Sequence, residues 1–209
     1  MKSYAQYCPI AHALDLVGDR WSLLIVRELL GHGPLRYSDI HARLSGCGTN
    51  ILAARLRSLE RGNIIRRRRL PPPAASTVYE LTPYGEELRP VVRELAHWGL
   101  RSLGPPSRED DLATDWLGPA LRTAFPPNPT AASIEFRIDD QCASFVGGVV
   151  RDGTTDEPDV VVEGSVEGLY RLVVDRDLDA LTIRGSRTVV RRLLETLPEP
   201  PSVGEPAAA

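Results

Sequence analysis

Four consecutive arginines, Arg66 to Arg69, lie in a segment, residues 64–70, that is otherwise apolar. A guanidinium group keeps its charge at neutral pH and donates paired hydrogen bonds to phosphate or carboxylate oxygens. The segment predicts a β-strand with Arg66 and Arg68 on one side and Arg67 and Arg69 on the other. A proline-rich turn and a second strand at 77–82 complete a basic ribbon. A run of charged residues is usually only a solvated surface. A function for this ribbon is therefore inferred only together with the helix that precedes it.

That element, a helix capped by Thr49 or Gly48 and ending at Arg61, is predicted to be amphipathic. At 100° per residue its leucines, Leu52, Leu56 and Leu59, fall on one side. The opposite side carries small and polar side chains: Asn50, Ala53, Ala54, Arg57 and Arg61. Asn and Arg bind adenine and guanine through paired hydrogen bonds, and small neighbours permit close approach to base edges. The pattern favours a helix that enters a DNA groove, with an ordinary solvated face as the alternative.

A helix followed at once by a basic ribbon can occupy one groove while the ribbon reaches the neighbouring backbone. The residues expected to contact DNA are Thr49, Asn50, Ala53, Ala54, Arg57, Arg61, Arg66, Arg67, Arg68, Arg69, Ser76 and Thr77. Three helices are expected before this pair, at 9–17, 20–30 and 37–44. Cys8-Pro9 opens the first of them, and Asp19 caps the second.

One long helix is expected after the ribbon, from Pro83 to Leu103, capped by Thr82 and bent at Pro90. Its apolar stripe is longer than a small domain can cover. We interpret the stripe as a dimer contact, with core packing as the alternative; its residues are Leu88, Val91, Val92, Leu95 and Trp98.

The charge is divided unevenly between the two halves of the chain. Residues 1–104 hold 15 Lys+Arg and 9 Asp+Glu, a balance of +6, whereas residues 105–209 hold 10 and 19, a balance of −9. A basic half suits a polyanion that an acidic half would repel, although two differently charged solvated surfaces would give the same balance.

Cysteine usage and hydropathy indicate a cytoplasmic protein. Three cysteines without a CxxC pair argue against a disulfide scaffold. The N-terminus has no apolar signal core and no segment reaches membrane-spanning length, so we expect no membrane partner. The four histidines lack metal-ligand spacing, and GxSxG, HExxH and phosphate-loop motifs are absent. We therefore expect neither an enzyme nor a metal or other cofactor.

Residues 8–99 resemble the HxlR family of winged-helix regulators, which are related to the MarR group. The resemblance rests on the segments CPIAHALDLVGDRWSLLIVREL, PLRYSDIHARL, LAARLRSLERGNIIRR, VYELTPYGEEL and HWG. It implies a homodimer with terminal helices at the interface, the 49–61 helix in the major groove and the ribbon as a wing. Members usually carry a basic residue where this chain has Ser76 and Thr77. Some sense oxidants through a cysteine at the position of Cys8, for which a small buried residue is the alternative.

The acidic half predicts an α+β sheet with helices over one face. Helices are expected at 111–123, 165–175 and 186–197, and strands at 132–138, 141–150, 158–164 and 178–185. Residues 159–197 resemble the sterol carrier protein type two domain, through DVVVEGSVEGLYRLV and LTIRGSRTVVRRLLETL. The resemblance implies an apolar ligand pocket, with plain core packing as the alternative for each candidate: Trp116, Leu121, Phe136, Phe145, Leu169 and Val173.

These patterns predict an α+β protein of two domains, 1–104 and 108–198, with a flexible tail at 199–209. The first domain is expected to dimerise and to bind double-stranded operator DNA as a transcriptional regulator. The second is expected to respond to a small hydrophobic effector. The alternative is a lipid or small-molecule carrier for which DNA binding is secondary.

Overall fold

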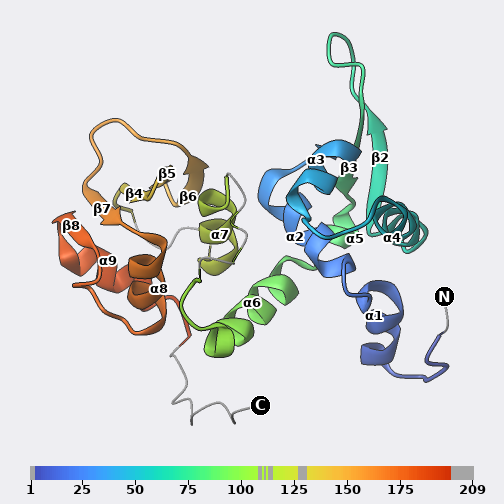
Figure 1. Cartoon of the computed structure of the whole chain (residues 1–209), viewed down its shortest axis with the longest axis horizontal. Coiled ribbons are helices and arrows are strands. Elements are labelled where there is room, and N and C mark those ends of the chain that lie inside the picture. Colours follow the sequence, from blue (N-terminus) through green and yellow to red (C-terminus); the bar gives the residue numbers. More distant parts are fainter. Residues whose placement is uncertain (1–2, 108–109, 111, 113–114, 127–130, 199–209) are drawn as a thin grey trace. The chain divides into compact units, whose positions relative to one another are not determined.

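The computed structural model describes residues 3–107, 110, 112, 115–126 and 131–198, and it divides the chain into two compact units (Figure 1). The units comprise residues 1–92 and 93–209. The division therefore falls inside helix α6 (Arg89–Leu103), whereas the composition placed it in the proline-rich segment that follows this helix. The expected tail, 199–209, lies outside the described residues.

The first unit is a winged helix-turn-helix fold. Its elements are α1 (Pro9–Val17), α2 (Ser22–His32), β1 (Leu35–Arg36), α3 (Tyr37–Arg43), α4 (Thr49–Arg61), β2 (Ile65–Arg69), β3 (Thr77–Leu81) and α5 (Pro83–Glu86), followed by the start of α6. The strands form an antiparallel sheet in the order β1-β3-β2. Figure 1 shows the β2–β3 hairpin projecting beyond the helices of this unit.

The amphipathic helix expected at 49–61 is confirmed as α4. Leu52, Leu56 and Leu59 are at most 1% exposed and pack with Ile25 and Ile40 in the core of the unit. Burying a leucine side chain stabilises a fold by roughly 1.5–3 kcal/mol, so this seam fixes which side of α4 remains free.

The start of α2 and the strand β1 differ from the expectation. Asp19 does not cap α2; its carbonyl accepts a hydrogen bond from the nitrogen of Ser22 at 3.0 Å, and Trp21 takes the capping position. Strand β1, which pairs Leu35 with Tyr79 of β3, was not expected, because two residues are too few to show an alternating pattern.

The prediction of a single bent helix at 83–103 was also wrong, because α5 and α6 are separate helices. Pro90 lies in the first turn of α6, where its missing N–H costs no helical hydrogen bond. In a continuous helix the same proline would lose its bond to the carbonyl of Glu86. The chain therefore breaks rather than bends.

Thr82 caps α5, as expected. Its hydroxyl accepts from the nitrogen of Gly85 at 3.0 Å and donates to the carbonyl of Asn63 at 2.6 Å. A Cβ on Gly85 would lie 2.0 Å from the carbonyl oxygen of Ile64. These contacts hold α5 closely against the start of the hairpin.

The second unit is an α+β fold. Beyond the end of α6 its elements are α7 (Leu117–Ala124), β4 (Ile134–Ile138), β5 (Gln141–Val146), β6 (Val149–Asp152), β7 (Val160–Gly164), α8 (Val166–Val174), β8 (Thr182–Gly185) and α9 (Arg187–Leu194). The sheet order is β6-β5-β4-β7-β8, with β4 and β7 parallel and the other pairs antiparallel. Helical residues such as Leu121, Leu172 and Val190 share one core with Phe136 and Phe145 of the sheet.

Two elements of this unit are shorter than the sequence predicted. The strand expected at 141–150 is two strands, because Gly147 and Gly148 turn the chain with φ values of 58° and 76°. Such positive φ angles are open to glycine at little cost, which makes a Gly-Gly pair a hairpin signal. Helix α7 begins at Leu117, later than the expected start at 111, and residues 111, 113 and 114 lie outside the described part.

The six residues expected to line a ligand pocket lie in or against the core of the second unit. Leu121, Phe136, Phe145 and Leu169 are buried, and Trp116 and Val173 pack against them. Phe136 and Phe145 also meet edge to face, with ring centroids 6.0 Å apart. This is the core packing that was the simpler interpretation, and the ligand pocket stays a prediction.

Candidate nucleic-acid interface

The first turn of α4 is held in place by neighbouring elements. The hydroxyl of Tyr37, on α3, donates to the carbonyl oxygen of Thr49 at 2.9 Å. Arg55, on the same helix, forms an ion pair with Asp19 in the turn before α2. Cys47 is buried in the turn between α3 and α4, and burial raises the pKa of its thiol. The helix is thereby fixed at its start and along one side.

The outward side of α4 carries the residues expected to read bases. Asn50, Arg57 and Arg61 are exposed, and Ala53 and Ala54 are half-buried between them. Within the described part of the chain, Arg57 and Arg61 form no ion pair. Their guanidinium groups are therefore available to an external acceptor.

The arginines of β2 form ion pairs with carboxylates on neighbouring elements. Arg66 and Arg68 both contact Glu80 on β3, through their Nε atoms, at 2.8 and 2.7 Å. Arg67 points to the other side and contacts Glu60 of α4, also through Nε, at 2.7 Å. The alternation expected for the four arginines agrees with these contacts.

These ion pairs shift the titration of the groups involved. The hydrogen bond from Arg68 lowers the pKa of Glu80, against the opposing effect of burial, and Arg66 lowers it further. The hydrogen bond with Glu60 raises the pKa of Arg67. Glu80 and Arg67 therefore both stay charged across the physiological range.

Position 79 joins the wing to the body of the unit. Tyr79, opposite Arg67 in the ladder, packs against the hydrophobic core, and burial raises its pKa. At the far end, Ser76 and Thr77 lie where the hairpin closes, with Leu70 donating its nitrogen to the carbonyl of Ser76 at 2.8 Å. Thr77 is exposed and Ser76 is half-buried, so both stay candidates for DNA contact.

The segment from Thr49 to Thr82 is strongly basic. It holds seven arginines and two glutamates, a balance of +5, although the whole chain has a net charge of −3. A concentration of positive charge over an exposed helix and an adjacent ribbon is the electrostatic pattern of a polyanion-binding surface.

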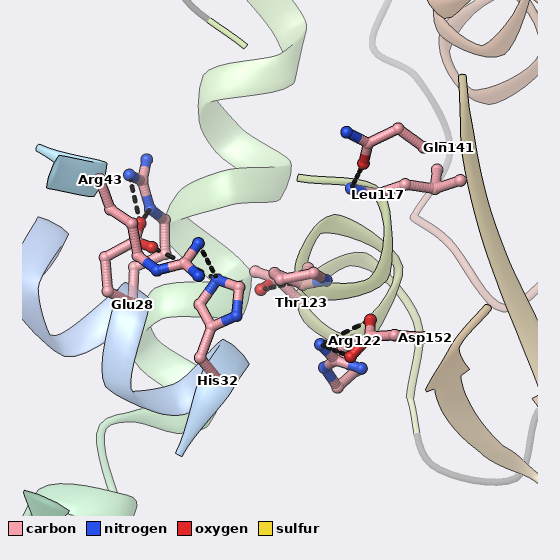
Figure 2. A network of polar contacts seen from close by, with 10 residues as sticks. Glu28, His32, Arg43, Leu117, Arg122, Thr123, Gln141 and Asp152 are labelled. Atoms are coloured by element: carbon pink, nitrogen blue, oxygen red, sulfur yellow. Dashed lines mark hydrogen bonds and ion pairs between the residues drawn. The ribbon is translucent and has the colours of Figure 1, made fainter. Parts of the chain in front are cut away.

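A polar cluster connects α2 with the end of α3 (Figure 2). Glu28, which is 7% exposed, accepts two hydrogen bonds from Arg27 and lies 3.5 Å from His32 Nε2. Arg43 Nη1, at the end of α3, lies 3.2 Å from the same His32 nitrogen. Burial opposes ionisation of Glu28, but the contacts with His32 and Arg27 together lower its pKa. None of these contacts was expected from the sequence.

The residues expected at a dimer contact fall into two groups. Val92 is 7% exposed and belongs to the core of the first unit, and Leu88 packs against that core. Val92 therefore stabilises the chain itself and was wrongly assigned to the dimer contact, whereas Leu88 is only half-buried and its assignment stays a prediction. Val91, Leu95 and Trp98 are 50%, 47% and 67% exposed.

The three cysteines are free thiols. Cys8 is half-buried at the N-terminus of α1, without a side-chain capping bond, and its redox role stays a prediction. Burial, together with the nearby Glu135 carboxylate, raises the pKa of Cys142.

Other polar groups in the second unit have a structural role. Arg122 contacts both carboxylate oxygens of Asp152, at 3.1 and 3.3 Å, and Gln141 accepts from the nitrogen of Leu117 at 3.3 Å (Figure 2).

Among the described residues, no cluster of three or more His, Cys, Asp or Glu side chains has a metal-binding arrangement. No helix in the described part is long and apolar enough to span a membrane.

Comparison with known proteins gives matches to about half of the chain. A family model described as HxlR-like helix-turn-helix matches residues 16–106. The uncharacterized HTH-type transcriptional regulator sll1512 of Synechocystis is 38% identical over 107 residues, covering 51% of this chain and 78% of that protein. The similarly described YvaP of Bacillus subtilis is 31% identical over 118 residues, covering 56% and 95%. The solved structure of the reduced form of the transcriptional regulator YodB from B. subtilis aligns at 32% identity with a TM-score of 0.41, covering 49% of this chain and 100% of that chain.

Proposed function

The chain belongs to the HxlR-like helix-turn-helix family of transcriptional regulators, and from this premise we propose that it acts as a homodimer on a two-fold symmetric DNA operator. One observation carries the proposal. The exposed face of α4 presents Arg57 and Arg61 without an ion pair to any described residue, beside a projecting wing with four arginines.

In the proposed complex α4 enters the major groove, and the wing follows the adjacent backbone. Asn50 and Arg57 contact base edges, because their side chains offer the donor and acceptor pairs that distinguish adenine and guanine. The wing arginines contact phosphates, which adds affinity without sequence information. The leucine seam of α4 is buried, so only the opposite side of the helix can face the groove.

Exposed apolar side chains support the dimeric part of the proposal. Ile10 and Leu14 on α1 are 72% and 46% exposed, and Val91, Leu95 and Trp98 on α6 are exposed as well. Apolar side chains on terminal helices stabilise an assembly when a second copy covers them. Native mass spectrometry of the purified protein tests this directly. A dimer mass supports the proposal, and a monomer at micromolar concentration contradicts it.

A hydrophobic effector in the second unit, and the alternative of a carrier role, stay predictions. The six residues expected to line its pocket pack with one another and with the surrounding core. A hydrophobic molecule that copurifies with the chain in the same native spectra would support this prediction.

The DNA-binding proposal is tested by an electrophoretic shift. The probe is duplex DNA from the region upstream of the gene for this protein, with unlabelled random duplex as competitor. A complex that survives the competitor and weakens with added salt supports the proposal. The absence of a salt-sensitive specific complex contradicts it.

A further inference from the structure

The carboxylate of Glu80 is shared between two wing arginines. Its Oε1 accepts from Arg66 Nε at 2.8 Å and its Oε2 from Arg68 Nε at 2.7 Å. Arg66 lies directly opposite Glu80 in the β2–β3 ladder, and Arg68 is two residues further along the same face. Each carboxylate oxygen thus serves one guanidinium group.

The carboxylate of Glu80 is more buried than the two arginine side chains that it contacts. The side chain of Glu80 is 12% exposed, whereas Arg66 and Arg68 are 62% and 44% exposed. Both contacts use Nε, and the terminal nitrogens of the two arginines donate to no described residue. Glu80 therefore orients both arginines with their terminal nitrogens free, and it offsets one of their two charges.

The other side of the wing has one ion pair of this kind. Arg67 Nε contacts Glu60, whose side chain is 22% exposed. Among the described residues, Arg69 is the wing arginine without a carboxylate partner. Four arginines therefore act against two carboxylates, and the wing presents a balance of +2 rather than +4.

We propose that Glu80 is a specificity-determining residue, which restrains sequence-independent DNA binding by lowering the charge of the wing. The inference rests on the proposed DNA-binding function. Affinity for random DNA grows with the number of phosphates that the protein neutralises, whatever the sequence. On the operator, base contacts from α4 fix the position of the wing. The orientation of Arg66 and Arg68 therefore also contributes to the affinity for the operator.

Removing the charge of Glu80 therefore affects the two kinds of binding unequally. Binding to random DNA gains the whole effect of one additional positive charge, about fivefold per wing near 0.15 M salt. Binding to the operator gains less, because two long side chains lose their fixed orientation and must be ordered on binding. The ratio of operator affinity to random affinity falls.

The test measures fluorescence anisotropy of labelled operator and random duplexes with the full chain over a salt series. The variants are Glu80→Gln and Glu80→Thr, both neutral, the second keeping a strand-forming residue if the first fails to fold. Glu86→Gln is the matched control, because Glu86 pairs with Arg89 at 2.6 Å outside the wing and loses the same charge.

For either neutral Glu80 variant, tighter random binding, a steeper salt dependence and a lower affinity ratio than for Glu86→Gln support the proposal. Behaviour equal to the control contradicts it. Weaker binding to both duplexes with an unchanged salt slope also contradicts it, since a merely structural brace would act in that way. If the wild-type chain binds neither duplex, the proposed function itself fails, which is a different result.

Discussion

The hydroxyl of Tyr37 donates to the carbonyl oxygen of Thr49 across 2.9 Å, so the first turn of α4 is tied to the start of α3. The tie sets the direction in which α4 leaves the turn, and Asn50 follows directly after the bonded residue. A single hydrogen bond between side chain and backbone thus couples the two helices of the helix-turn-helix.

Tyr37→Phe is expected to weaken operator binding while the unfolding free energy changes little. A partly exposed hydrogen bond contributes about 0.5–1.5 kcal/mol, and its loss leaves α4 freer to reorient. Anisotropy titrations with the operator measure the effect. Tyr84→Phe removes an exposed hydroxyl on α5 and serves as the control. Equal affinities for the two variants would show that the tie has no part in DNA binding.

Arg69→Ala is expected to weaken binding to all sequences by a similar factor. Arg69 is exposed on the wing and makes no ion pair with a described residue, so it suits a phosphate. Losing one phosphate contact lowers the slope of log affinity against log salt by about one. Arg151→Ala removes the same charge from an exposed site in the second unit. A loss confined to the operator would instead make Arg69 a base-reading residue.

Thr82→Val is expected to destabilise the first unit by roughly 1–3 kcal/mol, because it leaves buried polar groups unpaired. The hydroxyl of Thr82 serves the carbonyl of Asn63 and the nitrogen of Gly85, and the residue is 5% exposed. Urea unfolding followed by circular dichroism measures the change. Thr182→Val, on an exposed part of β8, should be nearly neutral. A neutral Thr82→Val would mean that the cap is dispensable.

Gly85→Ala is expected to be more damaging than an ordinary glycine replacement. The new Cβ would lie 2.0 Å from the carbonyl oxygen of Ile64, a backbone atom that cannot move without shifting the hairpin. Gly99→Ala is the matched control, since nothing described lies within 4 Å of its Cβ position and alanine favours the helix. Thermal unfolding should show a marked drop in Tm for the first variant alone; similar Tm values would contradict the close packing of α5.

Glu28 is expected to make the first unit sensitive to acid. Its pKa is lower in the folded chain than its ordinary value of 4.5, because contacts with His32 and Arg27 outweigh burial. A lowered carboxylate pKa stabilises the fold above the unfolded value and loses that contribution as pH falls through the folded value. The difference in unfolding free energy between the wild type and Glu28→Gln should therefore be largest at neutral pH and should shrink as the pH falls below 4.5.

Glu87→Gln, an exposed carboxylate of the same unit, is the control for that comparison. The difference between the wild type and the control should stay small at both pH values. A difference between the wild type and Glu28→Gln that grows on acidification would reverse the sign and contradict the assignment.

Local patterns predicted α4 and the hairpin well, because both depend on periodicity within one segment. Leu52, Leu56 and Leu59 lie at helical spacing, and the alternation of Arg66 to Arg69 follows from the strand alone. The pairing of Arg66 and Arg68 with Glu80 could not be read in this way, because it depends on the register between two strands. That register is set by the turn, whose geometry the prolines and alanines of 71–76 leave open.

The burial of polar residues was the other feature that the sequence did not predict. Glu28 looks like an ordinary charged residue of a helix, and only the packing of α2 against α3 shows that it is enclosed. Val92 belongs to an apolar stripe whose members the sequence cannot divide between core and surface. The structure makes that division, because Val92 is buried in the core and Val91 is exposed.

The most direct test of the central claim, that the outward face of α4 reads DNA sequence, is the affinity of Arg57→Ala for operator and random duplexes at one salt concentration. The substitution is expected to cost about 1–3 kcal/mol of binding free energy on the operator. On random DNA the loss of affinity is expected to be no larger than the small loss that Arg151→Ala shows. Equal losses on the two duplexes would contradict the claim, and would make this face of α4 a charged surface without a role in sequence recognition.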